Sequence, residues 1–102
     1  MSERREIERD GATPQKNSGR GRHQKGDAIL GDYLVDYKET GKGVTVNRTM
    51  WAKVCTDAMR HKKEPVLKVV IGDGRSHLRL AVISWEEFEE LRNYKIMYEA
   101  AM

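Results

Sequence analysis

Short runs of alternating apolar and polar residues predict β-strands in two parts of the chain. Residues 33–38 alternate with the period of two that a half-buried strand requires. With the short apolar stretch before them and a turn near Gly31-Asp32, they predict a hairpin over residues 25–40. The apolar run at 66–71 has the length of a central strand, and residues 76–83 alternate again. The pattern therefore predicts two β-hairpins, with 66–71 in the middle of the sheet.

Apolar residues at helical spacing predict two helices. The first begins at Asn47 or Thr49, either of which can cap it, and runs to about Lys62. Its apolar stripe consists of Trp51, Val54, Cys55, Ala58 and Met59. The second follows Ser84, which opens the capping-box pattern Ser-Trp-Glu-Glu, and we expect its first half to pack on the sheet.

The end of the second helix carries more apolar surface than a small domain covers. The residues concerned are Ile96, Met97, Tyr98 and Met102. This surplus predicts a contact between two copies of the chain, and a frayed tail is the alternative.

Length and composition indicate one small domain. The chain has 102 residues, of which 38% are hydrophobic. Residues 1–13 form an N-terminal segment, helical or disordered, with Glu3, Glu6 or Arg9 facing solvent, and 14–102 form the single domain. One cysteine excludes an internal disulfide, and no apolar run has the length of a membrane span or a signal peptide core. A cytoplasmic protein without membrane contact is expected.

The net charge of +3 is unevenly distributed. Residues 84–102 carry five glutamates against Arg92 and Lys95, a net charge of −3, so that residues 1–83 carry +6. Residues 14–25 contain four cations and no acid, which predicts a loop that contacts DNA phosphates, although a solvated tail has the same composition. These cations are Lys16, Arg20, Arg22 and Lys25. Arg20 is the first candidate, because glycines on both sides let a phosphate approach it closely.

Two carboxylates and a lysine come together on the hairpin predicted at 25–40. Asp36 and Lys38 lie two positions apart on one strand and project from the same face, and Asp27 lies on the paired strand. Carboxylate oxygens suit Mg²⁺, and a lysine beside them can stabilise charge on a phosphate. A surface hairpin with one exposed Asp-Lys pair explains the same residues. Asp32 is a rival for the role of Asp27, but it falls in the predicted turn.

The hairpin and its surroundings resemble a known family of nucleases. The likeness rests on the segments Asn17-Ser-Gly-Arg-Gly21, Lys25-Gly-Asp27 and Leu34-Val-Asp-Tyr-Lys-Glu-Thr40, followed by a helix and a second hairpin. This order is similar to that of the metal-dependent PD-(D/E)xK superfamily, and within it to the short phage-encoded relatives of Holliday junction resolvases. The resemblance extends from Pro14 to about Arg92. It implies an α/β fold with a restriction-endonuclease-like core, a mixed central sheet flanked by helices.

By position, the resemblance implies a role for each residue of the motif. Asp27 and Asp36 correspond to the metal-binding acids, Lys38 to the catalytic lysine, and the main-chain carbonyl of Tyr37 to a further metal ligand. The implied cofactor is Mg²⁺, with Mn²⁺ as an alternative. The chain departs from the family in two places: Asp27 follows Gly26 where proline is usual, and Asp36 stands where glutamate is more common.

The resemblance also implies an activity. It predicts an endonuclease that hydrolyses DNA phosphodiesters and resolves branched DNA such as Holliday junctions as a homodimer, in the cytoplasm of a bacterial host. A nicking or flap nuclease of the same fold is one alternative, and a small nucleic-acid-binding module without catalysis is another. Related nucleases often begin with a helix that supplies another acid. Glu6 or Glu8 is the candidate here, although solvated charges explain both.

Overall fold

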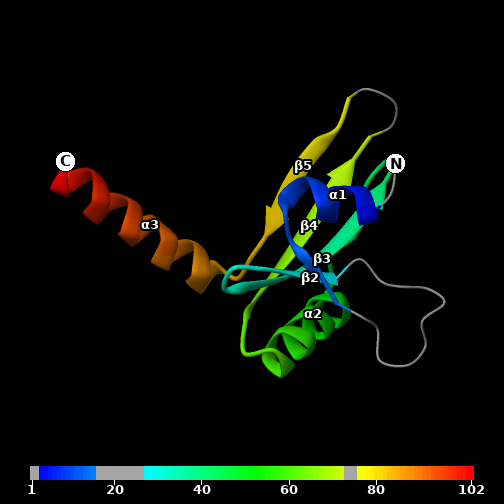
Figure 1. Ribbon diagram of the computed structural model, residues 1–102, viewed down its shortest axis with the longest axis horizontal. Coiled ribbons are helices and arrows are strands. Elements are labelled where there is room, and N and C mark those ends of the chain that lie inside the picture. Colours follow the sequence, from blue (N-terminus) through cyan, green and yellow to red (C-terminus); the bar gives the residue numbers. More distant parts are fainter. Residues whose placement is uncertain (1–2, 16–26, 73–75) are drawn as a thin grey trace.

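The computed structural model of the chain describes residues 3–15, 27–72 and 76–102. These residues form an α/β fold in which a five-stranded mixed sheet lies between two helices and a third helix projects from one end (Figure 1). The helices are α1 (Glu3–Asp10), α2 (Arg48–Arg60) and α3 (Trp85–Ala101). The strands are β1 (Thr13–Pro14), β2 (Asp27–Leu30), β3 (Tyr33–Thr40), β4 (Glu64–Ile71) and β5 (Leu78–Val82). Their spatial order is β1-β2-β3-β4-β5, with β3 and β4 parallel and the other neighbours antiparallel.

The hairpin of β2 and β3 confirms the strand prediction. Its two-residue turn is Gly31-Asp32, and Gly31 has a φ of 61°. A positive φ at the first central position is what a type II′ hairpin turn requires, and glycine adopts it without strain. The turn fixes the pairing of the strands, so that Leu30 lies opposite Tyr33 and Asp27 lies opposite Asp36.

The two faces of the sheet are covered by different helices. On one face, Ile7 of α1 packs with Val35 and Tyr37 of β3 in a buried cluster. On the other face, α2 packs against β3 and β4 and buries Val54 and Ala58. Successive residues of a strand point to opposite faces, so the even-numbered residues of β3 lie on the α2 side. The predicted helix cap is also confirmed, because the side chain of Asn47 accepts a hydrogen bond from the Met50 amide.

Three expectations from the sequence are wrong. Met59, part of the predicted apolar stripe, is 76% exposed. Glu6 faces the sheet rather than solvent and is only 2% exposed. The first half of α3 does not pack on the sheet, and the helix contains no buried residue.

The N-terminal end of α3, called its root below, is held by specific hydrogen bonds. Ser84 caps the helix by accepting from the Glu87 amide, as predicted. The Glu87 side chain accepts a hydrogen bond of 2.6 Å from the Tyr33 hydroxyl, whereas a capping box would direct it back to the start of the helix. Across the described ranges, no helix is both long enough and apolar enough to cross a membrane.

Candidate active site

The antiparallel register places the carboxylates of Asp27 and Asp36 side by side. The Asp27 carbonyl accepts a hydrogen bond of 2.9 Å from the Gln15 amide, so its main chain is directed away from β3. The Thr40 carbonyl accepts from the Gly72 amide, and by strand alternation the main chain of Asp36 also faces β4. Asp27 and Asp36 are therefore a non-hydrogen-bonded pair, in which Cα atoms are about 4.5 Å apart and side chains lie closest.

Each of the two carboxylates has one buried oxygen that accepts no hydrogen bond from the described residues. Asp36 is 4% exposed, and the Oδ1 atoms of Asp36 and Asp27 are buried without a hydrogen-bond donor among the described residues. Lys38 Nζ lies 3.6 Å from Asp36 Oδ1, close enough for charge attraction but too long for a hydrogen bond. Buried carboxylate oxygens without donors are costly. They are also the atoms that a metal ion would coordinate.

The proximity of the two acids changes the acidity of Asp27. Burial is the largest cause, and repulsion from Asp36 and then from Asp57 adds to it, raising the pKa of Asp27 to about 6 from the ordinary 3.8. Asp27 therefore holds a negative charge at neutral pH at a cost in free energy. A cation bound between the two acids would remove that cost.

The donor set fits a magnesium ion. Mg²⁺ binds through one or two carboxylates and completes its octahedron with water and phosphate oxygens. In the part of the chain that the structure describes, no group of three or more histidines, cysteines or acids is placed to hold a metal. By strand alternation the main-chain carbonyl of Tyr37 is directed towards the β2 side, next to the Asp27–Asp36 pair. Two carboxylates with a carbonyl nearby suit a hard ion that keeps several waters.

Two charged residues of α2, Lys53 and Asp57, also act on the carboxylate of Asp27. Neither is among the site residues predicted from the sequence. Attraction to Lys53 lowers the pKa of Asp27 and repulsion from Asp57 raises it. Lys53 Nζ lies 3.2 Å from Asp57 Oδ2, and the two side chains are 48% and 21% exposed. The signal in the sequence was their spacing of four residues beside the apolar stripe of α2, which places both on one side of the helix.

The other candidate residues lie elsewhere. Asp32 is exposed in the hairpin turn, at the opposite end of β3 from Lys38. Glu8 is exposed and lies 3.8 Å from Arg4 on α1, so it does not reach the acid pair. The proposed DNA contacts Lys16, Arg20, Arg22 and Lys25 lie outside the described residues.

Glu6 belongs to an ion network on the α1 face. Arg79 donates from Nε and Nη2 to the two Glu6 carboxylate oxygens, each at 3.0 Å. Lys68 Nζ lies 3.1 Å from Glu6 Oε1 and 2.7 Å from Asp10 Oδ2, which also accepts from the Tyr37 hydroxyl at 2.9 Å. The hydrogen bonds from Arg79 are the main reason that the pKa of Glu6 falls to about 2. Glu6 is thus on the opposite face of the sheet from Asp36.

Comparison of the chain with protein families, curated proteins and solved structures finds no match. The candidate site therefore rests on the placement of Asp27, Asp36 and Lys38 themselves. Their arrangement has three properties of a phosphate-cleaving metal site: paired carboxylates, buried oxygens that accept no hydrogen bond from the described residues, and an adjacent cation.

Replacing Asp27 by asparagine is expected to stabilise the metal-free protein. The folded carboxyl has a pKa of about 6 against 3.8 for the ordinary group, so it binds a proton more tightly when folded, and folding loses stability as pH rises from about 4 to 6. Because Asp27 is partly exposed, the expected gain in the free energy of unfolding on replacing it by asparagine is about 1–2 kcal/mol at pH 7. Urea unfolding in chelator at pH 4 and pH 7 measures it. A gain for Asp27→Asn that is no larger at pH 7 than at pH 4 contradicts the explanation.

Proposed function

We propose that the protein is a metal-dependent endonuclease that hydrolyses DNA phosphodiesters, with the restriction-endonuclease-like core that its motif implies. The observation that carries this proposal is the Asp27–Asp36 pair. The two acids face each other across a hairpin, each with a buried Oδ1 that accepts no hydrogen bond from the described residues, and Lys38 lies beside them. An exposed Asp-Lys pair on an ordinary hairpin would have neither the burial nor the second acid.

Each residue of the site has a distinct part in the proposed reaction. Asp27 and Asp36 would hold Mg²⁺ or Mn²⁺, and the Tyr37 carbonyl would be a further ligand. When bound, the metal polarises the phosphate and lowers the pKa of a bound water. Lys38, whose side chain is 35% exposed, reaches from the buried acids towards solvent, where the scissile phosphate would lie. Its ammonium stabilises the charge that develops on the phosphate in the transition state or orients the attacking water.

The proposed substrate is branched DNA. Residues 1–83 carry a net charge of +6, which favours binding to phosphates, and Lys16, Arg20, Arg22 and Lys25 remain the proposed backbone contacts. Recognition of a junction by its shape needs two symmetric active sites, which a homodimer supplies. Lys53, close enough to act on the Asp27 charge, is a further candidate for contact with a phosphate near the metal.

A cleavage assay across DNA structures tests the proposal. Labelled four-way junction, flap and linear duplex are incubated with Mg²⁺, with Mn²⁺ and with chelator. We expect paired, symmetric cuts in the junction that require metal. Cutting of the flap alone would support the nuclease site but would refute the four-way junction as the substrate. Salt-sensitive binding without cleavage under every metal condition would refute the enzyme and leave a nucleic-acid-binding module.

A further inference from the structure

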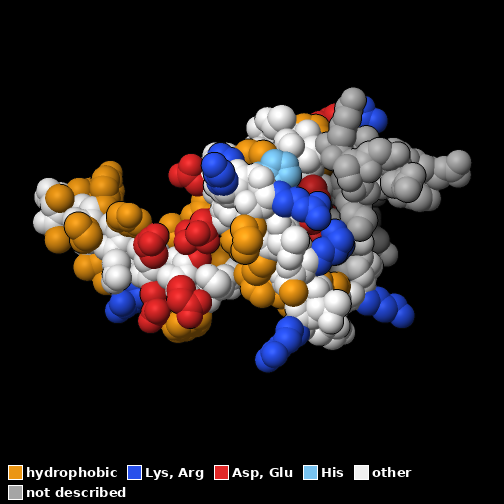
Figure 2. All heavy atoms as spheres, turned by 90° about the horizontal axis from the view of Figure 1, so that it is seen from below, with side chains coloured by type: hydrophobic (Ala, Val, Ile, Leu, Met, Phe, Trp, Pro, Cys, Tyr) orange, Lys and Arg blue, Asp and Glu red, His pale blue; other side chains and the backbone are white. Residues whose placement is uncertain are grey.

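Helix α3 exposes apolar side chains on all sides of its second half. Between residues 94 and 102 the only charged residues are Lys95 and Glu99. Ile96, Met97 and Tyr98 follow one another, so they point in directions about 100° apart, and they are 47%, 66% and 69% exposed. Figure 2 shows acidic side chains near the root of this helix and apolar ones at its tip. A helix that is apolar all round is normally buried. We therefore expect residues 94–102, called the tip of α3 below, to pack against another surface.

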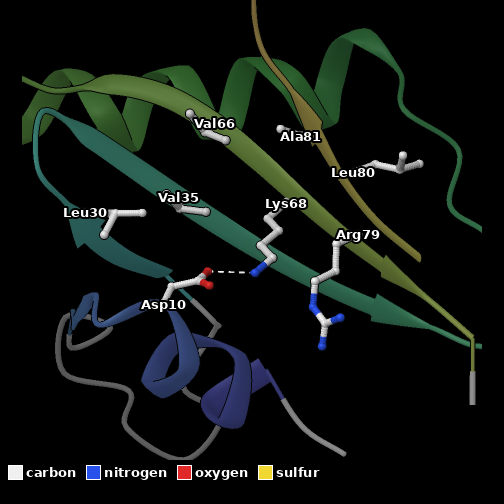
Figure 3. Close-up of a pocket in the computed structure, with 8 residues that line it drawn as sticks. All are labelled: Asp10, Leu30, Val35, Val66, Lys68, Arg79, Leu80 and Ala81. Carbon is white, nitrogen blue, oxygen red and sulfur yellow. Dashed lines mark hydrogen bonds and ion pairs between the residues drawn. The ribbon is translucent and has the colours of Figure 1, made fainter. Parts of the chain in front are cut away.

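The sheet has a matching apolar cavity on its α1 face. The cavity measures about 250 Å³ and lies across β2 to β5 (Figure 3). Its apolar lining consists of Leu30, Val35, Val66, Leu80 and Ala81. The charged residues at its margin are already paired, since Lys68 and Arg79 bind Asp10 and Glu6. The cavity is smaller than the roughly 300–1,000 Å³ of most small-molecule sites, and its size and lining suit inserted apolar side chains.

The cavity lies at the root of α3. Leu30 pairs with Tyr33, whose hydroxyl donates to Glu87 in the first turn of the helix. Ala81 lies on β5 shortly before the same turn. From this root α3 projects away from the sheet (Figure 1). A helix of 17 residues extends about 25 Å, so the apolar tip lies one helix length from the cavity of its own chain.

We propose that a second copy of the chain covers these surfaces, with the two α3 helices antiparallel. In that arrangement the tip of each helix lies beside the root of the other, where the partner's apolar cavity is located. Every contact occurs twice about a two-fold axis, so a closed dimer forms from one self-complementary surface. The dimer depends on these apolar surfaces and not on the Asp27–Asp36 pair, so it extends the proposed function without requiring cleavage.

The charges of α3 favour antiparallel over parallel pairing. The acids Glu86, Glu89 and Glu90 are all in the first half of the helix. Parallel helices would place these glutamates against their counterparts, whereas antiparallel helices place them against the nearly uncharged tip of the partner. Residues 84–102 have a net charge of −3 and residues 1–83 have +6, so the helix is also attracted to the partner's body. Both complementary surfaces occur on one chain, which is why the occupant is a second copy.

Molar mass in solution tests the dimer. We expect the full chain to sediment as a dimer, and the double variant Met97→Glu/Tyr98→Glu to sediment as a monomer with unchanged circular dichroism. Ala81→Arg, which fills the cavity from an exposed position, is expected to give a monomer as well. Met59→Glu is the matched control, because Met59 is 76% exposed on α2, and it should remain a dimer. A monomeric full chain, or a dimeric double variant, would overturn the proposal.

Cysteine cross-linking tests the direction of pairing. In a Cys55→Ser background, chains carrying Tyr98→Cys are mixed with chains carrying Ala81→Cys and oxidised. We expect a cross-linked pair only in the mixture, because an antiparallel dimer brings each tip to the other chain's cavity. A link between two Tyr98→Cys chains would overturn the antiparallel arrangement. Both experiments measure the molar mass of the protein and do not depend on DNA cleavage. The dimer can therefore be refuted while the nuclease proposal stands, and the reverse is also possible.

Discussion

Replacing Asp36 by asparagine is expected to abolish metal-dependent DNA cleavage while preserving the fold. Asp36 is 4% exposed and lies directly opposite Asp27, so its carboxylate is the group best placed to share a cation with the second acid. An amide of the same shape removes one negative charge and weakens binding of a hard ion. The loss in cleavage rate should be at least as large as the about 10²–10³-fold typical of removing a transition-state contact. Single-turnover cleavage and Mg²⁺ titration by calorimetry measure the two effects.

Two further variants separate metal binding from catalysis. Lys38→Ala is expected to reduce cleavage by about 10²–10³-fold and to leave Mg²⁺ binding intact, because in the proposed reaction the ammonium acts on the phosphate and not on the ion. Asp32→Asn is the matched control, since Asp32 is exposed in the turn of the same hairpin, and it should cleave as the unaltered protein does. Normal cleavage by Asp36→Asn would contradict the proposed site.

Replacing Glu6 by glutamine is expected to be the most destabilising of these changes. Glu6 is 2% exposed and holds Arg79 through two hydrogen bonds of 3.0 Å and Lys68 through a contact of 3.1 Å. The amide leaves both cations without their shared counter-charge at the junction of α1 and the sheet. Removing one partner of a buried ion pair costs about 3–5 kcal/mol, and the partial exposure of Arg79 reduces this to about 2–4 kcal/mol. Chemical unfolding at pH 7 measures the change.

The pH dependence of unfolding identifies the charge of Glu6 as the cause. The pKa of Glu6 falls from 4.5 to about 2 on folding, so its contribution is complete above about pH 4.5 and is lost as pH falls towards 2. The difference between the unaltered protein and Glu6→Gln should therefore shrink in acid. Glu8→Gln is the control on the same helix, because Glu8 is exposed, and it should change stability by less than about 1 kcal/mol. A Glu6→Gln deficit that is unchanged at low pH would show that shape, and not charge, matters.

Local sequence was sufficient to predict the hairpin and the cap of α2. Alternation along 33–40 and the glycine at position 31 fix β3, its turn and its pairing, so the meeting of Asp27 and Asp36 could be foreseen. The role of Glu6 could not, because its partner Arg79 lies 73 residues away and nothing in the short N-terminal segment indicates it. The packing of α3 was mispredicted because its apolar residues predict burial but do not specify what covers them.

The local sequence also does not predict that residues of α2 act on the site. Lys53 and Asp57 act on Asp27 because the crossover from β3 to β4 places α2 on the face where Asp36 projects. Spacing along the helix shows that the two residues share a side of it, but not which strand that side approaches. Only the packing of the helix on the sheet supplies that relation.

Neighbouring residues of β3 serve different purposes, because some form the proposed site and others hold the fold together. Asp36 and Lys38 lie on the face of the proposed chemistry, whereas Tyr37 between them is 1% exposed on the face that holds α1 through Asp10. Selection on stability and selection on activity can therefore act on alternate positions of one strand with little interference. The same alternation makes the strand intolerant of insertion, because shifting it by one residue would exchange the two faces. A single inserted residue in β3 would cost the protein both its core and its charged site.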